Sequence, residues 1–185
     1  MTLPLKELLK LEPEAMLKHT ERPGPDELRY KVQTYYDDVQ VGQEIPKYIQ
    51  RFTGVHLVRW CFAMENTHRI HYDHAFAINH DKLPGILLHG SWRVSIFASW
   101  LKDWALPDGW FWKAAWQVRS MVVADEITIV WGRVTNKYVK DGLGFIDLEI
   151  GIQNQDGVEG CPGTATVVLP LKGGKPVPYP FVAPK

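Results

Sequence analysis

Residues 90–104 constrain the fold more than any other stretch, because they predict a helix that is apolar around most of its circumference. Gly90-Ser91 opens this helix, and Ser91 is the expected N-cap residue. One stripe of apolar side chains consists of Val94, Phe97, Ala98 and Leu101. A second apolar side consists of Trp92, Ile96, Trp100 and Trp104, which leaves only Arg93, Ser95, Ser99, Lys102 and Asp103 as polar residues. A helix of this kind must be wrapped by other structure.

Alternating apolar and polar residues predict the strands that do the wrapping. The expected strands are residues 45–52, 110–123, 126–136, 145–153 and 164–171. The order of one strand, then helices, then four strands favours an antiparallel meander, and Pro162 and Pro170 place the last strand at an edge. The economical packing is an α+β arrangement with one curved antiparallel sheet around one long central helix.

The rest of the chain predicts two extensions of this unit. Residues 1–35 are expected to be an N-terminal helical extension, with short helices in residues 4–18 and a polar connector at 19–29. Residues 36–171 hold the predicted domain. The proline-rich residues 172–185 predict an extended C-terminal tail.

Composition excludes several classes of function. The 185 residues carry a formal net charge of zero, which argues against a binder of nucleic acid or of an anionic membrane. No run approaches the roughly 20 apolar residues that a membrane-spanning helix needs. Charged residues from Lys6 onward argue against a secretory signal, and two cysteines without a disulfide framework favour a reducing, cytoplasmic location.

The segment from Met64 to His74 concentrates the chemistry, with three imidazoles, two carboxylates and one amide in eleven residues. It follows an apolar helix that Thr53-Gly54 caps, and it precedes the long helix. Titratable groups between two apolar helices are costly to place unless they are paired or used. The segment fits four interpretations: a solvated loop, a buried hydrogen-bonded cluster, a metal site or a catalytic site.

The metal interpretation depends on the even spacing of His68, His71 and His74. On a helix, positions i, i+3 and i+6 spread over too wide an arc for one ion, although a loop could gather them. We therefore expect no metal at this segment.

Three segments together resemble the MaoC-type acyl dehydratases, relatives of the (R)-specific enoyl-CoA hydratases. The segments are residues 36–46, the string Asn66-x-His-Arg-Ile-His-Tyr-Asp73, and Leu88-His89-Gly90. The resemblance extends from about residue 36 to 171 and implies the hot-dog fold. It implies a lyase of fatty-acid metabolism that adds or removes water at the Cα–Cβ bond of an acyl-CoA. It also implies no cofactor, and a homodimer or higher oligomer in which sheets pair edge to edge.

The resemblance assigns roles residue by residue. The family motif reads Asp-x-Asn-Pro-x-His, so His71 takes the place of the catalytic His and Asn66 that of the catalytic Asp. His68 stands where the motif has Asn, and Arg69 where it has Pro. Gly90 matches the glycine whose N–H polarises the thioester carbonyl at the start of the central helix.

Asn66 is the departure from the pattern, because an amide cannot exchange a proton as a carboxylic acid does. His71 could then be the sole proton-transfer group, with Asn66 orienting the water or the 3-hydroxyl. Glu65 or His68 could take part of the acid–base work as secondary candidates. Alternatively, the chain could have kept thioester binding and lost the chemistry.

Structural roles compete with each of these assignments. Asn66 is also a residue that caps the C-terminus of a helix, and Gly90 also suits a sharp turn into one. The alternative function is a non-catalytic acyl-thioester-binding subunit of a heteromeric hydratase. A thioesterase would need a carboxylate facing the thioester, and Asp103 lies too far along the helix. Acyl chain length, branching and reaction direction stay open.

Overall fold

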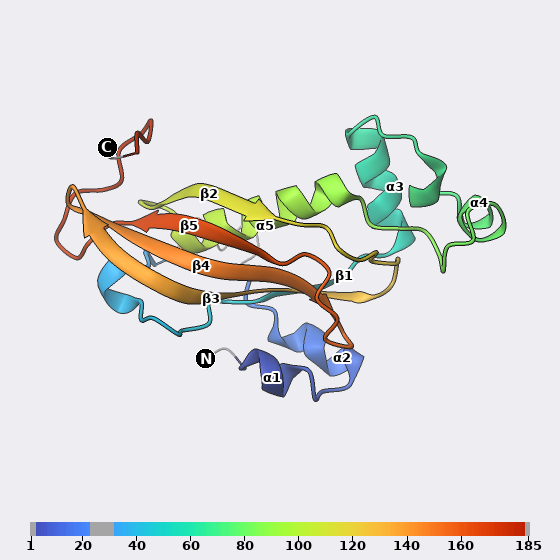
Figure 1. The fold of residues 1–185 in the computed structure, drawn as a ribbon, viewed down its shortest axis with the longest axis horizontal. Coiled ribbons are helices and arrows are strands. Elements are labelled where there is room, and N and C mark those ends of the chain that lie inside the picture. The colour runs from blue at the N-terminus through green and yellow to red at the C-terminus, as the bar shows by residue number, and fades with distance from the viewer. Residues whose placement is uncertain (1–2, 23–31, 184–185) are drawn as a thin grey trace.

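A five-stranded antiparallel sheet curls around helix α5 (Gly90–Ala105) in the computed structural model, which describes residues 3–22 and 32–183 (Figure 1). The strands are β1 (Tyr48–Arg51), β2 (Trp110–Trp116), β3 (Ile127–Lys140), β4 (Leu143–Asn154) and β5 (Gly163–Leu169). Their order across the sheet is β1-β3-β4-β5-β2. The predicted α+β architecture, one curved sheet around one long helix, is therefore confirmed.

The strand bounds agree with the prediction to within four residues, except in β2. This strand ends at Trp116 instead of continuing to Val123. Beyond Trp116 the chain leaves the sheet, and the N–H groups of Gln117 and Arg119 donate to the carbonyls of Pro162 and Gly160. Val123 forms only an isolated bridge with Leu87, so residues 117–123 bring the chain to the segment just before α5.

The predicted four-strand meander is wrong, because only β3, β4 and β5 follow one another across the sheet. Strand β2 pairs with β5, from Trp110–Val168 to Trp116–Gly163, and so closes the far side of the sheet. This places β5 in the interior and makes the prediction of an edge wrong. Pro162 and Pro170 lie just outside the strand, where they remove no hydrogen bond from the ladder.

The short helices form two groups. Near the N-terminus are α1 (Leu5–Leu8), α2 (Pro13–Met16) and the 3-10 turn Leu17–His19, as predicted for residues 4–18. Between β1 and α5 lie α3 (Gly54–Ala63), the 3-10 turn Arg69–His71 and α4 (His74–Asn79), and a further 3-10 turn covers Tyr36–Asp38. Most of the predicted connector at 19–29 lies outside the described residues.

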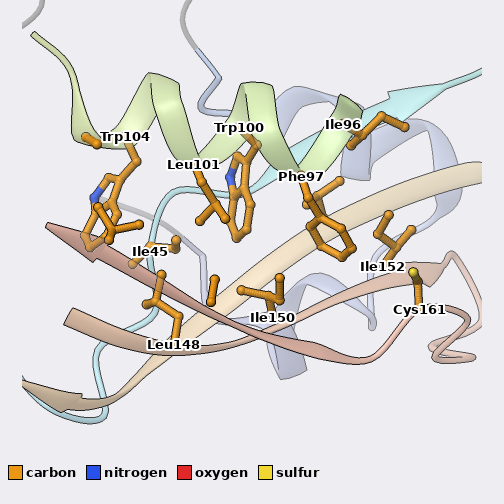
Figure 2. Close-up of a cluster of buried hydrophobic side chains, with 14 of the residues drawn as sticks. Ile45, Ile96, Phe97, Trp100, Leu101, Trp104, Leu148, Ile150, Ile152 and Cys161 are labelled. Atoms are coloured by element: carbon orange, nitrogen blue, oxygen red, sulfur yellow. The ribbon is translucent and has the colours of Figure 1, made fainter. Parts of the chain in front are cut away.

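The inner face of the sheet packs against α5 (Figure 2). Phe97, Trp100 and Leu101 extend from the helix toward β4, where Leu148 and Ile150 meet them. A Cβ atom at Gly132 of β3 would lie 2.8 Å from the Trp100 ring, so a glycine is needed for this close approach. Trp100 also donates its Nε1–H to the Pro46 carbonyl at 2.7 Å.

Three details of α5 differ from the sequence prediction. Val94 is 41% exposed, although it belonged to the predicted buried stripe, whereas the polar Arg93 is 1% exposed. Arg93 is accommodated because its Nη1 donates to the Gly160 carbonyl at 3.2 Å. The N-cap residue is His89 and not Ser91, since the helix begins at Gly90, two residues earlier than a cap at Ser91 predicts.

The outer face of the sheet is covered by the two ends of the chain. Leu8 and Met16 of the N-terminal helices pack on Ile127 and Ile129 of β3. Over residues 172–183 the C-terminal tail has no regular structure, and Phe181 packs against the outer side of the sheet near β2 and β4. Helices α3 and α4 lie instead at the end of the molecule where α5 begins (Figure 1). Within the described residues, no helix has both the length and the apolarity that crossing a bilayer requires.

Candidate active site

Helix α3 places Asn66 beside the start of α5. Its N-terminus is fixed by the predicted Thr53 cap, which forms a reciprocal capping box with His56. Its C-terminus ends in a Schellman motif: Glu65 has a positive φ of 51°, and the Asn66 N–H donates to the Cys61 carbonyl at 3.1 Å. The main chain of Asn66 therefore caps the helix, while its side chain stays available for the site.

The Asn66 amide is held from both ends. Its Oδ1 accepts the backbone N–H of His68 at 3.3 Å. Its Nδ2 lies 3.2 Å from Nδ1 of His89. An amide nitrogen can only donate, so Nδ1 of His89 is the acceptor of this bond. One N–H and one lone pair of the amide remain for a further partner.

His89 is a buried, neutral histidine with a single tautomer. It is 1% exposed, and its Nε2 lies 3.2 Å from the Cys61 sulfur. Since Nδ1 accepts from Asn66, Nε2 carries the proton and donates to that sulfur. Burial, together with the neighbouring His71, lowers the pKa of His89 to about 4. Burial also raises the pKa of the Cys61 thiol, so this pair carries no charge near neutral pH.

His71 presents one free ring nitrogen. Its Nδ1 lies 2.8 Å from the Leu87 carbonyl oxygen, which can only accept, so Nδ1 carries the proton. In the neutral ring, Nε2 then holds the lone pair that a general base needs. The ring stacks on His89 with centroids 3.5 Å apart at 22°. Burial lowers the pKa of His71 below its ordinary value and nearby His68 lowers it further, while the bond to Leu87 opposes both.

Gly90 contributes a bare N–H next to these rings. It is the first residue of α5, directly after His89, and it is exposed. Among the described residues, no group accepts its N–H, and a Cβ atom at this position would meet nothing within 4 Å. Neither φ nor packing therefore demands a glycine here. What the glycine provides is open space over a donor at the positive end of the helix dipole.

The other candidates lie at the margin of this arrangement. His68 is exposed, its ring accepts the Ile70 N–H at 3.4 Å, and its centroid is 6.1 Å from that of His71. Glu65 is exposed at the helix end, and His74 is exposed on α4. Over residues 3–22 and 32–183, no three His, Cys, Asp or Glu side chains come together as metal ligands would. Asp73 has a structural role, as it caps α4 through Phe76 and binds Arg69.

Two residues of the site, His89 and Cys61, were not predicted from the sequence. His89 was visible beside Gly90, but nothing in the sequence tied it to Asn66, which lies 23 residues earlier. Cys61 belongs to the apolar stripe of its helix and gave no polar signal. The packing of α3 against the start of α5 brings these groups together, and such a contact cannot be read from spacing along the chain.

Comparison with known proteins finds one matching family model and several similar folds. A family model described as Htd2, hydroxyacyl-thioester dehydratase type 2, matches residues 27–108, a segment that includes the whole candidate site. No curated protein sequence matches the chain. The R-hydratase PhaJ1 from Pseudomonas aeruginosa superimposes with a TM-score of 0.66 at 18% identity, covering 83% of this chain and 96% of the hydratase. The chain has the hot-dog fold.

Two further hot-dog structures are similar. The MaoC-like dehydratase from Rhodospirillum rubrum gives a TM-score of 0.62 at 16% identity over 74% of this chain and 96% of its own. A chain of the ChsH1-ChsH2 complex from Mycobacterium tuberculosis gives 0.60 at 19% identity over 71% and 98%. At identities this low, the structural similarity establishes the fold alone. Together with the family model, they confirm the predicted resemblance of this hot-dog protein to the MaoC-like dehydratases and R-hydratases.

Proposed function

We propose that the protein is an acyl-CoA hydratase or dehydratase that adds or removes water at the Cα–Cβ bond of an acyl thioester. The observation that carries this proposal is the position of His71. Its ring, oriented through Leu87, stacks on the residue that immediately precedes the free N–H of Gly90. This contact supports a site in which His71 is the proton-transfer group and the Gly90 N–H, from another segment of the chain, is the oxyanion donor.

In the hydration direction, Nε2 of His71 takes a proton from water as the water oxygen bonds to Cβ. Electrons of the Cα–Cβ double bond shift toward the thioester carbonyl, whose oxygen accepts from the Gly90 N–H. The His71 imidazolium then returns its proton to Cα, so that one water has been added and the base is regenerated. A preorganised donor at such an oxygen contributes about 2.7–4 kcal/mol in other enzymes, and general acid–base catalysis about 10²–10⁴-fold.

Asn66 takes an orienting role in this scheme. Its unused N–H and lone pair can hold the attacking water or the 3-hydroxyl, but the amide cannot transfer a proton. His71 then carries the proton in both steps. The exposed His68 and Glu65 stay secondary candidates for sharing that work.

A groove along α5 suits the acyl group. It has a volume of about 330 Å³, and its lining includes Trp92, Ser95 and Ser99 on the helix together with Trp60 of α3. Trp60 and Trp92 stack with centroids 5.0 Å apart. We propose this groove for the acyl chain because its helical wall begins at Trp92, in the first turn of α5 that Gly90 opens.

A non-catalytic thioester-binding subunit is the second candidate, and the amide at position 66 favours it. The similarity to a chain of the ChsH1-ChsH2 complex agrees with a heteromeric assembly. In that case the protein binds acyl-CoA without turnover until a partner chain that carries the Asp/His pair is added.

The test follows hydration of enoyl-CoA substrates at the enone absorbance. We expect turnover by the wild type and a loss of about 10²–10⁴-fold in kcat for His71→Ala, the range of general acid–base catalysis. His74→Ala is the matched control, because His74 is an exposed histidine three residues away. Equal turnover by the two variants would remove His71 from the mechanism.

A further inference from the structure

We infer that His89 is a positioning residue, which holds the Asn66 amide and the His71 ring on the same side of the Gly90 N–H. The inference rests on the proposed function, since it names what orients the groups that perform it. His89 is the residue that contacts both of the others: it bonds to Asn66 at 3.2 Å and stacks on His71 at 3.5 Å.

The position of His89 at the start of α5 does not by itself explain this residue type. N-cap residues ordinarily have short side chains whose oxygen accepts an N–H of the first turn. The His89 side chain makes no capping hydrogen bond. Both ring nitrogens bond away from the helix instead, to Cys61 of α3 and to Asn66 just beyond it. Ser, Asn or Asp would cap the helix better, so the ring has another purpose.

The contact with Asn66 decides which way the amide points. A free asparagine can exchange its oxygen and nitrogen by rotation. Here the acceptor Nδ1 of His89 selects the nitrogen on one side, and the backbone N–H of His68 selects the oxygen on the other. The unused N–H and lone pair of Asn66 are thereby fixed in direction, as an orienting role toward water or a hydroxyl requires.

The contact with His71 is a stack between two rings of different function. The His71 ring is anchored at its edge through Nδ1 and on its face by His89. The surrounding groups keep His89 neutral: its hydrogen-bond partners are the Cys61 thiol and the Asn66 amide, and the facing ring is itself basic. His68 is the next titratable group on the His71 side, and Arg69 there is bound to Asp73. The proton of the reaction therefore stays on His71, because His89 does not compete for it.

Two substitutions separate the contacts. His89→Phe keeps a flat ring against His71 but removes the acceptor for Asn66. His89→Asn removes the stacking ring but keeps an acceptor, because its side-chain oxygen is attached to Cγ as Nδ1 is in histidine. We expect His89→Phe to lower kcat by about 10- to 10²-fold with KM nearly unchanged, because displacements on the order of 1 Å in a catalytic group have effects of this size.

Non-additivity distinguishes positioning from a general structural role. If His89 acts through Asn66, His89→Phe introduced into Asn66→Ala should cost less than about threefold, whereas independent effects would multiply. Melting temperatures confirm that each variant is folded. Wild-type kcat in a folded His89→Phe variant, or full multiplication in the double variant, would overturn the inference.

An NMR comparison tests the contact without relying on turnover. In ¹⁵N-labelled wild-type protein we expect His89 as the Nε2–H tautomer, and slower exchange for the Asn66 side-chain amide proton that bonds to His89 than for the other one. His89→Phe should abolish this difference by releasing the bonded proton to fast exchange, and His89→Asn should retain its protection. Unchanged Asn66 amide signals in His89→Phe would overturn the inference. Absence of turnover by the wild type would instead count against the proposed function, and the NMR comparison would still decide whether His89 holds Asn66.

Discussion

At the scale of single residues, the site depends on two neutral histidines with opposite tautomers. His71 keeps its proton on Nδ1 because a carbonyl oxygen faces it, and His89 keeps its proton on Nε2 because an amide N–H faces Nδ1. His71 therefore keeps a basic nitrogen, Nε2, free. Both ring nitrogens of His89 are occupied by hydrogen bonds. Two residues of one type therefore take different roles from their hydrogen-bond partners alone.

The neutral state of His89 predicts acid-sensitive stability. Its pKa is about 4 in the folded protein and about 6.5 in the unfolded chain, so the unfolded state binds more protons between these values. The free energy of unfolding should therefore decrease as the pH falls from 7 to 4, with about 3 kcal/mol of the loss due to His89. Urea unfolding of wild type and His89→Phe across this range measures the effect. The difference in stability between the two proteins should change with pH, and parallel curves would contradict the prediction.

At the scale of elements, the sequence of α5 predicted the helix correctly but misjudged which of its side chains are buried. The apolar pattern of residues 90–104 predicted the helix and the sheet around it, because burial on nearly all sides leaves few alternatives. The same pattern misplaced Val94 and Arg93, since a buried guanidinium depends on a carbonyl 67 residues away. The local sequence pattern predicts how much of a helix is buried. It does not reveal the long-range hydrogen bonds that allow a polar side chain to be buried in the core.

The sheet shows the same limit. Alternation in residues 145–153 predicted β4 and its inward face, where Ile146, Leu148, Ile150 and Ile152 are buried. It could not reveal that β2 pairs with β5, because pairing across the sheet joins residues some 50 positions apart. For the candidate site, the motif identified His71, Asn66 and Gly90 as candidates, and the contacts that connect them emerged only from the fold.

The first turn of α5 offers a paired test of the Gly90 N–H. Gly90→Pro removes the donor, and proline is favoured at the first position of a helix. The preceding residue already has φ −60° and ψ 136°, which a following proline requires. Gly90→Ala keeps the donor but adds a Cβ atom where open space exists.

We expect both variants to fold with melting temperatures near that of the wild type. Gly90→Pro should lose about 10²–10³-fold in kcat, as other enzymes do when one oxyanion donor is removed. Gly90→Ala separates the contribution of space from that of the donor. Wild-type kcat in a folded Gly90→Pro variant would show that this N–H does not stabilise the transition state.

At the scale of the whole molecule, β2 lies at an edge of the sheet, because among residues 3–22 and 32–183 it pairs only with β5. Unpaired strand edges favour association with another chain. We expect two copies to pair along β2, giving twice the chain mass of 21.2 kDa in light scattering. Ala115→Glu places a carboxylate at an exposed position of this strand and should shift the mass toward one chain by like-charge repulsion. A monomeric wild type, or an unaffected dimer in the variant, would contradict pairing along this edge.

The central claim is that an imidazole and a peptide N–H from separate segments flank one thioester. A crystal structure with a bound 3-hydroxyacyl-CoA, determined for the inactive His71→Gln variant, tests it most directly. We predict the thioester oxygen about 2.7–3.1 Å from the Gly90 nitrogen, and the 3-hydroxyl within hydrogen-bond reach of residue 71 and of Asn66. A thioester bound elsewhere, or a carbonyl turned away from Gly90 with the hydroxyl remote from residue 71, would contradict the account.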